Sequence, residues 1–168
     1  MNKLKIEPLS KHHDRKKFDC GEKELNHYLQ AVASQHAKKG ISRTFVLVDV
    51  DSPNCILGFV TLTACEIEAE FLPHPYSKKF PLKVSGAKIG RLAIANDFQQ
   101  QGLGNQLMVF AMRQAVIVHQ SLGLTGLMVD AKSEQAKSYY QQYGFLPLPD
   151  NPFTLFLPIK SILEAFKS

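Results

Sequence analysis

RLAIANDFQQQGLGNQL, residues 91–107, joins two different sequence patterns. An apolar run that favours a strand ends at Ala95, and a helical pattern begins after two glycines, Gly102 and Gly104. Glycines at the start of a helix expose backbone N–H groups, and the helix dipole adds partial positive charge there. The stretch therefore predicts a strand, a loop suited to a phosphate or pyrophosphate, and a helix.

Two common phosphate-binding motifs do not fit this loop. A dinucleotide-binding fingerprint requires G-x-G-x-x-G, and its third glycine is missing because Asn105, Gln106 and Leu107 follow Gly104. A nucleotide P-loop requires G-K-[ST], which does not occur in the sequence. Two glycines that merely turn the chain remain an alternative at this point.

The composition favours one domain that spans residues 1–168, because 168 residues with 45% hydrophobic content can form a single core. The sequence has no apolar run of about 20 residues that would cross a membrane, and residues 1–10 lack the apolar centre of a secretory signal. Cys20, Cys55 and Cys65 are an odd number without metal-ligand spacing, and the histidines are scattered. We therefore expect reduced thiols, no metal site and a cytoplasmic location.

The positive charge of the chain is clustered. The formal net charge is +5, and lysine, arginine and histidine concentrate at residues 11–17 (KHHDRKK), 36–40 (HAKKG) and 77–80 (SKKF). Such a surface favours a polyanionic partner, either a nucleic acid or a phosphorylated cofactor, although solvated lysines are the alternative.

Periodicity of the apolar residues predicts the remaining elements. Two β-forming runs at residues 43–50 and 56–71, joined by a turn at 51–54, should form an antiparallel hairpin, and the proline-rich residues 73–86 should form a loop. An α/β fold follows, with a mixed sheet and helices on both faces. The other expected elements are a strand at 4–9, a helix that carries Leu25, Tyr28, Leu29 and Val32 on one face and stops near Gly40, a strand at 87–95, a helix at 105–123, a strand at 124–131, a helix at 133–144 capped by Ser133, strands at 145–148 and 153–159, and a short C-terminal helix.

Two motifs together resemble the acetyl-CoA-binding core of the GNAT superfamily of N-acetyltransferases. They are Gln99-x-x-Gly102-x-Gly104 and, about thirty residues later, Ala136-x-x-x-Tyr140-x-x-x-Gly144-Phe145. The resemblance implies a mixed, mostly antiparallel sheet with a central, splayed parallel strand pair. It also implies that acetyl-CoA is the cofactor and that main-chain amides wrap its pyrophosphate, those of Gln99, Gln100, Gln101, Gly102, Leu103, Gly104 and Asn105. The pantetheine arm would form hydrogen bonds with Leu92, Ala93 and Ile94, and residues 127–130 would splay away beside the thioester. Ser133 stands where the family often has an asparagine that contacts the pantetheine.

The resemblance also assigns the catalytic acid. Tyr140 matches the family tyrosine that protonates the coenzyme A sulfur, and a phenol suits this role because its reference pKa is about 10. Backbone N–H groups near Ile94 would polarise the thioester carbonyl. Tyr139 and Tyr143 are expected to pack or to lie at the rim of the site. For the base, Glu66, Glu68 and Glu70 alternate with apolar residues and should share one face of a strand, either as a proton relay or as a solvated face.

The N-terminal half narrows the resemblance to one subgroup. The segments FDCGEKELNHYL, RTFVLVD, ILGFVTLTA, IGRLAIANDFQQQGLG and VDAKSEQAKSYYQQYGF are similar, in this order, to the GNAT toxins of bacterial toxin–antitoxin pairs. The implied activity is acetylation of the α-amine of aminoacyl-tRNA, which blocks translation, and the implied partner is a ribbon-helix-helix antitoxin; a homodimer is also expected. Candidate tRNA-binding residues are Arg15, Lys16, Lys17, Lys38, Lys39 and Arg91.

Two other functions remain open from the sequence. One is a metabolic or protein N-acetyltransferase that acts on a small amine or a protein N-terminus. The other is a GNAT fold that binds acetyl-CoA without catalysis, which the intact loop and Tyr140 argue against.

Overall fold

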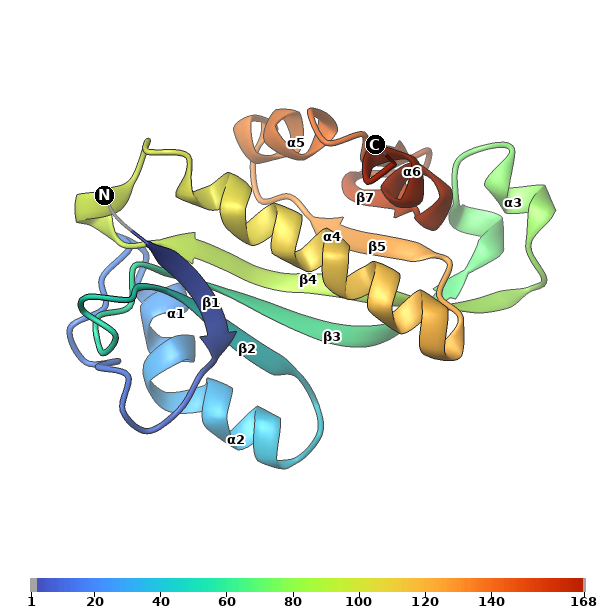
Figure 1. Cartoon of the computed structure of the whole chain (residues 1–168). Helices are drawn as coiled ribbons and strands as arrows, with labels where there is room; N and C mark the ends of the chain where they lie inside the picture. Colours follow the sequence, from blue (N-terminus) through green and yellow to red (C-terminus); the bar gives the residue numbers. More distant parts are fainter. Residues whose placement is uncertain (1–2, 168) are drawn as a thin grey trace. The chain divides into compact units, whose positions relative to one another are not determined.

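The computed structural model describes residues 3–167. Residues 1–2 and 168, the ends of the single domain expected from the sequence, lie outside this range. The strands form one mixed sheet in the order β1-β2-β3-β4-β5-β7-β6 (Figure 1). They are β1 (Leu4–Pro8), β2 (Arg43–Asp49), β3 (Gly58–Glu68), β4 (Lys83–Ile94), β5 (Gly126–Asp130), β6 (Leu146–Leu148) and β7 (Asn151–Pro158).

The sheet contains both parallel and antiparallel neighbours. β4 and β5 pair in parallel, whereas β1–β2, β2–β3, β5–β7 and β6–β7 are antiparallel, so the predicted α/β fold with a mixed sheet is confirmed. Within residues 3–167 no helix combines the length and the apolar character needed to span a membrane. The helices are α1 (Lys23–His27), the π-helix η1 (Tyr28–Val32), α2 (Ala33–Lys38), the 3₁₀-helix η2 (Ala69–Phe71), α3 (Tyr76–Lys79), the 3₁₀-helix η3 (Asn96–Phe98), α4 (Leu103–Leu122), α5 (Glu134–Gln141) and α6 (Ile159–Ala165).

The chain divides into two compact units, each with its own interior. Unit 1 comprises Met1–Thr63 and Gly90–Ala111, and unit 2 comprises Ala64–Ile89 and Met112–Ser168. Three elements, β3, β4 and α4, continue along the chain from one unit into the other.

Unit 1 is built on the predicted hairpin of β2 and β3, which pair from Arg43↔Leu62 to Leu47↔Gly58. Because successive strand residues point to opposite faces, Val46 and Val48 join one cluster with Tyr28 and Leu29 of η1. The Phe45 ring points to the other side and lies 4.8 Å from the ring of Phe110 in α4. Helices therefore cover both faces in this unit.

The first helical segment contains a π-turn that its sequence did not predict. The backbone N–H of Ala33 donates to the carbonyl of Tyr28, five residues earlier. The turn accommodates one extra residue, so Ala33 is fully buried while Val32 is only partly buried.

Unit 2 has two distinct packing faces. Leu127, Leu155 and Leu157 are fully buried on one side of β5 and β7. Met128 and Phe156 point to the other side, where they form a cluster with Leu72 and other residues. This second face is the one beside the segment that carries η2 and α3.

The loop predicted for residues 73–86 is wrong in part. The segment contains α3, and β4 begins at Lys83 rather than at Ala87. Gly86 suggested a turn, but it is buried inside the strand, where a Cβ would collide with the Ile67 side chain. Any larger residue at this position would require the Ile67 side chain, 19 positions earlier, to shift, and local sequence does not reveal this packing.

The strand predicted for residues 56–71 is too long. β3 ends at Glu68, and Glu70 lies in η2. The prediction that Glu66, Glu68 and Glu70 share one strand face is therefore wrong for Glu70, because a 3₁₀ turn breaks the two-residue alternation.

Candidate active site

The glycine loop lies in unit 1, between β4 and α4. Two of its residues adopt the left-handed region, Gln100 with φ 63° and Gly102 with φ 78°. Glycine takes that conformation without steric cost, and it turns the chain directly into the first residue of α4, Leu103. Because the first N–H groups of an α-helix have no acceptor inside the helix, residues 100–105 are suited to an anion.

The Gln99 side chain stabilises this loop through hydrogen bonds to two backbone carbonyls. Its Nε2 donates to the carbonyl of Ile94 at 2.9 Å and to the carbonyl of Cys20 at 3.1 Å. The N–H of Asn96 also donates to the Asp19 carbonyl at 2.8 Å, so the loop is tied twice to residues 19–20. Gln99 therefore supports the loop through its Nε2 group.

The strand before the loop has one unpaired edge. Within residues 3–167, β5 pairs with β4 over Ala87–Ile89, whereas β4 continues for five more residues to Ile94. At the end of β4 the N–H of Ala95 donates to the Leu57 carbonyl, so the opposite side is engaged. Leu92, Ala93 and Ile94 can thus offer backbone groups to an extended ligand, as an added strand would use them.

Tyr140 lies on α5 in unit 2. Ser133 caps this helix, because its Oγ accepts the N–H of Ala136 at 3.0 Å, which confirms the predicted N-cap. The Tyr140 ring packs edge-on against Phe145 at 5.7 Å. Burial raises the pKa of Tyr140, so its hydroxyl keeps a proton at neutral pH.

The neighbouring tyrosines bond to each other. The hydroxyl oxygens of Tyr139 and Tyr143 lie 3.2 Å apart, and their rings pack edge-on. Within the described part of the chain, the Tyr140 hydroxyl forms no such bond, which leaves its proton available. The arrangement agrees with packing roles for Tyr139 and Tyr143.

The structure distinguishes no carboxylate as the base. Glu66, Glu68 and Glu70 are all exposed, and Glu66 forms an ion pair with Lys83 at 3.6 Å. A better-held carboxylate, which the sequence did not single out, is Asp130 at the end of β5. Burial would raise the pKa of Asp130, but hydrogen bonds from Lys88 and Thr154 outweigh it and lower the pKa, so Asp130 is a weak base.

Two of the predicted tRNA-binding residues meet in one groove of unit 1. Arg15 and Lys38 line a cavity of about 480 Å³, together with Lys11 and Arg43. Among the described residues that line it there are four cations and no carboxylate. Arg43 was missed by sequence reasoning, because it lies outside the basic clusters and only the fold brings it to the groove.

The other predicted cations lie elsewhere. Lys16 and Lys39 are exposed, and Lys17 pairs with Asp14 at 3.8 Å. The guanidinium of Arg91 stacks on the ring of Tyr28 at 3.7 Å. This stacking anchors Arg91 inside unit 1, so it is the least suited of the six to contact a phosphate.

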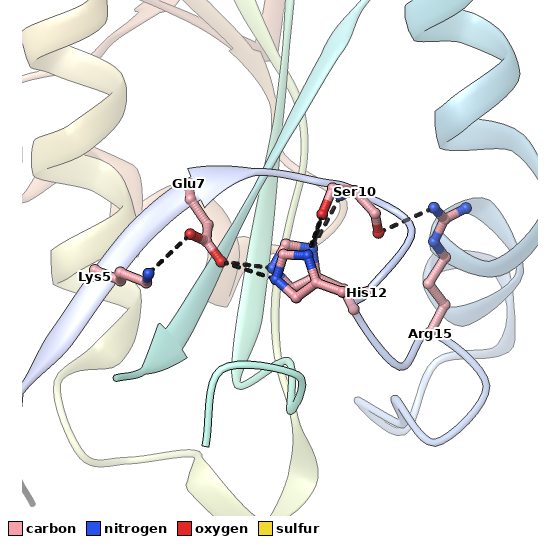
Figure 2. A network of polar contacts seen from close by, with 6 residues as sticks. Lys5, Glu7, Ser10, His12 and Arg15 are labelled. Atoms are coloured by element: carbon pink, nitrogen blue, oxygen red, sulfur yellow. Dashed lines mark hydrogen bonds and ion pairs between the residues drawn. The ribbon is translucent and has the colours of Figure 1, made fainter. Parts of the chain in front are cut away.

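A cluster of Glu7, His12 and His13 has the composition of a metal site, but its hydrogen bonds favour a network without metal (Figure 2). The backbone N–H of Ser10 donates to His13 Nδ1 at 3.0 Å. In a neutral ring the proton must then sit on His13 Nε2, which faces Glu7 Oε2 at 2.7 Å. A metal would need the lone pair of that Nε2, so the observed bonds oppose ligation.

Comparisons with known proteins extend over almost the whole chain. The profile of the acetyltransferase (GNAT) domain matches residues 40–147. A probable toxin TacT of Sinorhizobium fredii is 26% identical over 167 residues, which covers 94% of this chain and 92% of the relative. A tRNA-acetylating toxin of Mycobacterium tuberculosis is 29% identical over 143 residues, which covers 85% of this chain and 84% of the relative.

Solved structures agree with the whole chain in the same way. AtaT complexed with acetyl-methionyl-tRNAfMet is 34% identical, with a TM-score of 0.91 over 98% of this chain and 100% of that chain. A tyrosine-to-phenylalanine mutant of KacT gives the same identity and TM-score over 97% and 99%. A tyrosine-to-phenylalanine mutant of AtaT bound to the C-terminus of the antitoxin AtaR and acetyl-CoA is 30% identical, with a TM-score of 0.84 over 99% and 100%.

Proposed function

Because this chain belongs to the GNAT acetyltransferase family, we propose that it transfers the acetyl group of acetyl-CoA to the α-amine of an aminoacyl-tRNA. The observation that carries the proposal is the agreement over 98% of the chain with AtaT, which was solved with acetyl-methionyl-tRNAfMet. The likeness includes the N-terminal unit, which carries the basic groove. Acetylated aminoacyl-tRNA cannot serve elongation, so the protein acts as a toxin of translation, in the cytoplasm.

The cofactor fits the geometry of unit 1. The loop from Gln99 to Asn105 offers backbone donors to the pyrophosphate, and the unpaired edge of residues 92–94 offers backbone groups to the pantetheine amides. The Ser133 hydroxyl accepts from Ala136 and still has its own proton to donate. The bound cofactor supplies an activated acetyl thioester, and this chain positions the reactants and supplies the acid. We expect residues 1–168 to act as one acetyltransferase domain.

Tyr140 provides the proton for the leaving group. With the acetyl thioester supplied by the bound cofactor, the α-amine would form the C–N bond as the C–S bond breaks, and the Tyr140 hydroxyl would give its proton to the leaving sulfur. The proton that the amine loses would pass through water and restore the Tyr140 hydroxyl. The amine must be neutral to attack. A reference α-amine has a pKa of about 8 against about 10.4 for lysine, and an adjacent ester lowers it further, which suits a site with no dedicated base.

The basic groove of Lys11, Arg15, Lys38 and Arg43 holds the tRNA backbone. Phosphate oxygens match the charge of these four side chains, and arginine can bind a phosphate through two N–H groups. Lys16 and Lys39 are exposed and directly follow Arg15 and Lys38 in the sequence. Their charges add to the positive electrostatic potential that attracts tRNA.

An antitoxin partner completes the proposal. AtaT was solved with the C-terminus of its antitoxin AtaR and acetyl-CoA, and we expect a cognate ribbon-helix-helix antitoxin to cover the active site of this chain. A homodimer is a further expectation. Size-exclusion chromatography with light scattering tests the homodimer on this protein alone, and it tests antitoxin binding after addition of the product of the neighbouring gene.

The deciding experiment incubates the protein with labelled acetyl-CoA and charged tRNA, with uncharged tRNA and a polyamine as parallel acceptors. We expect label on the aminoacyl group of charged tRNA and on neither of the other acceptors. Label on the polyamine or on protein lysines, with none on the aminoacyl group, would make this chain a metabolic or protein N-acetyltransferase. Binding of acetyl-CoA without any turnover would indicate the non-catalytic alternative.

A further inference from the structure

The basic groove of unit 1 is hollow beneath its four cations, and phosphate contacts alone do not use this hollow. Its volume is about 480 Å³, within the range of about 300–1,000 Å³ that is typical of small-ligand sites. Contacts to a phosphate backbone need only cations at the surface. The groove therefore has room for a further part of its ligand.

Three segments form the walls of the groove, and hydrogen bonds hold them together. They are the end of β1 with the loop after it, the helix α2 and the start of β2. The N–H of Leu9 donates to the Thr44 carbonyl at 3.0 Å, and the hydroxyls of Thr44 and Thr61 bond to each other at 2.8 Å. The hydroxyl of Ser42, directly before β2, lies 3.0 Å from that of Tyr28 in η1. The walls are therefore fixed by contacts within unit 1.

The floor of the groove is apolar. Leu9 packs against the buried cluster to which Ala33 belongs, and Ala33 is only 1% exposed. Ala33 and Ala37 lie four residues apart on α2 and therefore point to the same side of this helix. Because alanine has a short side chain, the pair leaves space that a longer side chain would fill. A flat ring can lie on such a floor, whereas a phosphate gains nothing from apolar contacts.

The four cations of the groove have no carboxylate partner among residues 3–167. The lysine ion pairs of this part of the chain use other residues, namely Lys5, Lys17, Lys83 and Lys88. Arg15 is half-buried, and its guanidinium donates to the Ser10 carbonyl at 3.3 Å, which fixes its place and leaves its other N–H groups for a ligand. Uncompensated positive charge around a hollow suits several phosphate charges, and a guanidinium plane can also stack on a base.

A base-paired stem of RNA cannot use this floor. In an A-form duplex the bases are paired and stacked, and proteins contact its phosphates and 2′-hydroxyls from outside. An unpaired nucleotide can turn its base out and place it on a protein surface while its phosphates bind cations. The apolar floor and the surrounding cations together therefore match one unpaired nucleotide.

We propose that the basic groove binds a single unstacked nucleotide, with the base on the floor of Leu9, Ala33 and Ala37 and the adjoining phosphates on the four cations. In tRNA such a nucleotide comes from an unpaired segment, and a free nucleoside triphosphate presents the same chemistry. The inference rests on the proposed function, because it takes tRNA as the ligand. It specifies that the groove holds tRNA by an unpaired segment and not by a stem.

The first test removes the bases from a ligand and keeps its charge. Fluorescence anisotropy compares a six-nucleotide RNA of adenosine with an abasic oligomer of the same length, and saturating acetyl-CoA keeps the cofactor site filled. We expect the abasic oligomer to bind about 5-fold more weakly, because burial of one face of a base on an apolar surface is worth about that factor. Equal affinities, or no binding of either oligomer, would overturn the inference and leave the proposed function intact. Absence of label on charged tRNA in the acetylation assay would instead refute the proposed function.

Ala37→Leu shows whether the base lies in the groove. The longer side chain fills the floor and leaves the four cations in place, so the adenosine and abasic oligomers should bind with nearly equal affinity. Ala31→Leu is the matched control, because Ala31 is exposed on η1 and does not line the groove. Lys38→Ala should weaken both oligomers by a similar factor and keep their ratio. A wild-type ratio in Ala37→Leu would place the base outside the groove and overturn the inference. Stabilisation of each variant by acetyl-CoA shows that it is folded.

Two further comparisons distinguish the source of the nucleotide. A hairpin RNA with an unpaired 3′ extension should bind about 5-fold more tightly than the same hairpin with an abasic extension of equal charge. ATP should displace the adenosine oligomer at a lower concentration than inorganic tripolyphosphate, which has no base. Discrimination by ATP alone would make a free nucleotide the ligand of the groove. Discrimination in neither comparison would overturn the inference and leave the groove with phosphate contacts only.

Discussion

Gln99 illustrates how a motif residue can act through other residues. Its amide holds the carbonyls of Ile94 and Cys20, and Cys20 lies 79 positions away in the sequence. The glutamine of the Gln99-x-x-Gly102-x-Gly104 motif thereby fixes where the loop begins. Its role is to position the backbone donors that follow.

Replacement of Gln99 by alanine should therefore weaken both the fold and cofactor binding. Two hydrogen bonds of about 1 kcal/mol each are lost, and each kcal/mol corresponds to about 2–4 °C in melting temperature for a chain of this length. Differential scanning fluorimetry with and without acetyl-CoA should show a lower melting temperature and a smaller stabilisation by the cofactor. Gln106→Ala, an exposed glutamine on α4, is the control and should change neither value.

Tyr140→Phe should reduce turnover by about 10²–10⁴-fold and leave acetyl-CoA affinity nearly unchanged, because the ring remains and the acid is lost. The pH profile adds a check. Since burial places the pKa of Tyr140 above its ordinary value of about 10, kcat of the wild-type protein should show no alkaline decline up to about pH 9. Full activity of the phenylalanine variant would mean that another group protonates the sulfur.

At the scale of elements, the loop after β1 is fixed by the network in Figure 2. Glu7 accepts from Lys5 at 3.1 Å and from His13 at 2.7 Å, and Ser10 links His13 to Arg15, whose guanidinium donates to the Ser10 carbonyl. Arg15 thus reaches the basic groove from a loop that β1 holds in place. Arg15, one of the four groove cations, is therefore positioned by side-chain hydrogen bonds in a loop, without a helix or strand.

This network predicts a pH dependence of stability. The hydrogen bond from His13 is the main cause that lowers the pKa of Glu7, and Lys5 lowers it further. A carboxylate whose pKa is lower in the folded than in the unfolded chain stabilises the fold above the unfolded pKa, about 4.3, and loses this effect as pH falls through the folded value. Glu7→Gln should therefore lower the melting temperature at pH 7, and the difference from wild type should shrink below about pH 4. The exposed Glu164 on α6 serves as the control, since Glu164→Gln should give a small difference with no such trend.

The elements divide into those that local pattern could predict and those that distant contacts decide. The β2–β3 hairpin and the Ser133 cap follow from strand propensity and capping chemistry between near neighbours. The start of β4 includes Gly86, which packs against Ile67, and the groove is lined by Arg43 and Lys11 from different segments, so neither follows from local pattern. The motifs located the loop and Tyr140 in the sequence, but which cations share a groove required the fold.

For the whole molecule, charge is sorted by location. The groove of unit 1 carries four cations, while a cavity of unit 2 that Glu66, Glu68, Asp130 and Lys88 line carries three carboxylates and one ammonium group. A polyanion with a cationic end group, which describes an aminoacyl-tRNA, has complementary charge to both. The net charge of +5 alone would not distinguish this substrate from any other nucleic acid.

The groove predicts how tRNA binding should respond to salt. Each phosphate contact that is removed should lower the slope of log K against log salt concentration by about 0.7–0.9. Lys38→Ala and Arg43→Ala together should therefore reduce the slope by about 1.4–1.8, with acetyl-CoA affinity unchanged. Filter binding between 50 and 300 mM salt measures this, and Lys160→Ala on α6, outside the groove, should keep the wild-type slope. Slopes that do not differ would exclude the groove from tRNA contact.

The π-turn at Tyr28–Val32 absorbs one residue more than a regular α-helix of the same path would hold. An in-frame loss of one codon there, such as that of the exposed Ala31, would remove the extra residue and let a regular α-helix continue. The residues from Ala33 to Lys38 would keep their orientation, so Lys38 would stay in the groove. The same loss inside the regular helix α2, such as that of the exposed Gln35, would rotate the residues after it by about 100° and turn Lys38 away from the groove. A three-nucleotide deletion should therefore be tolerated at one position of this helix and disarm the protein four residues later.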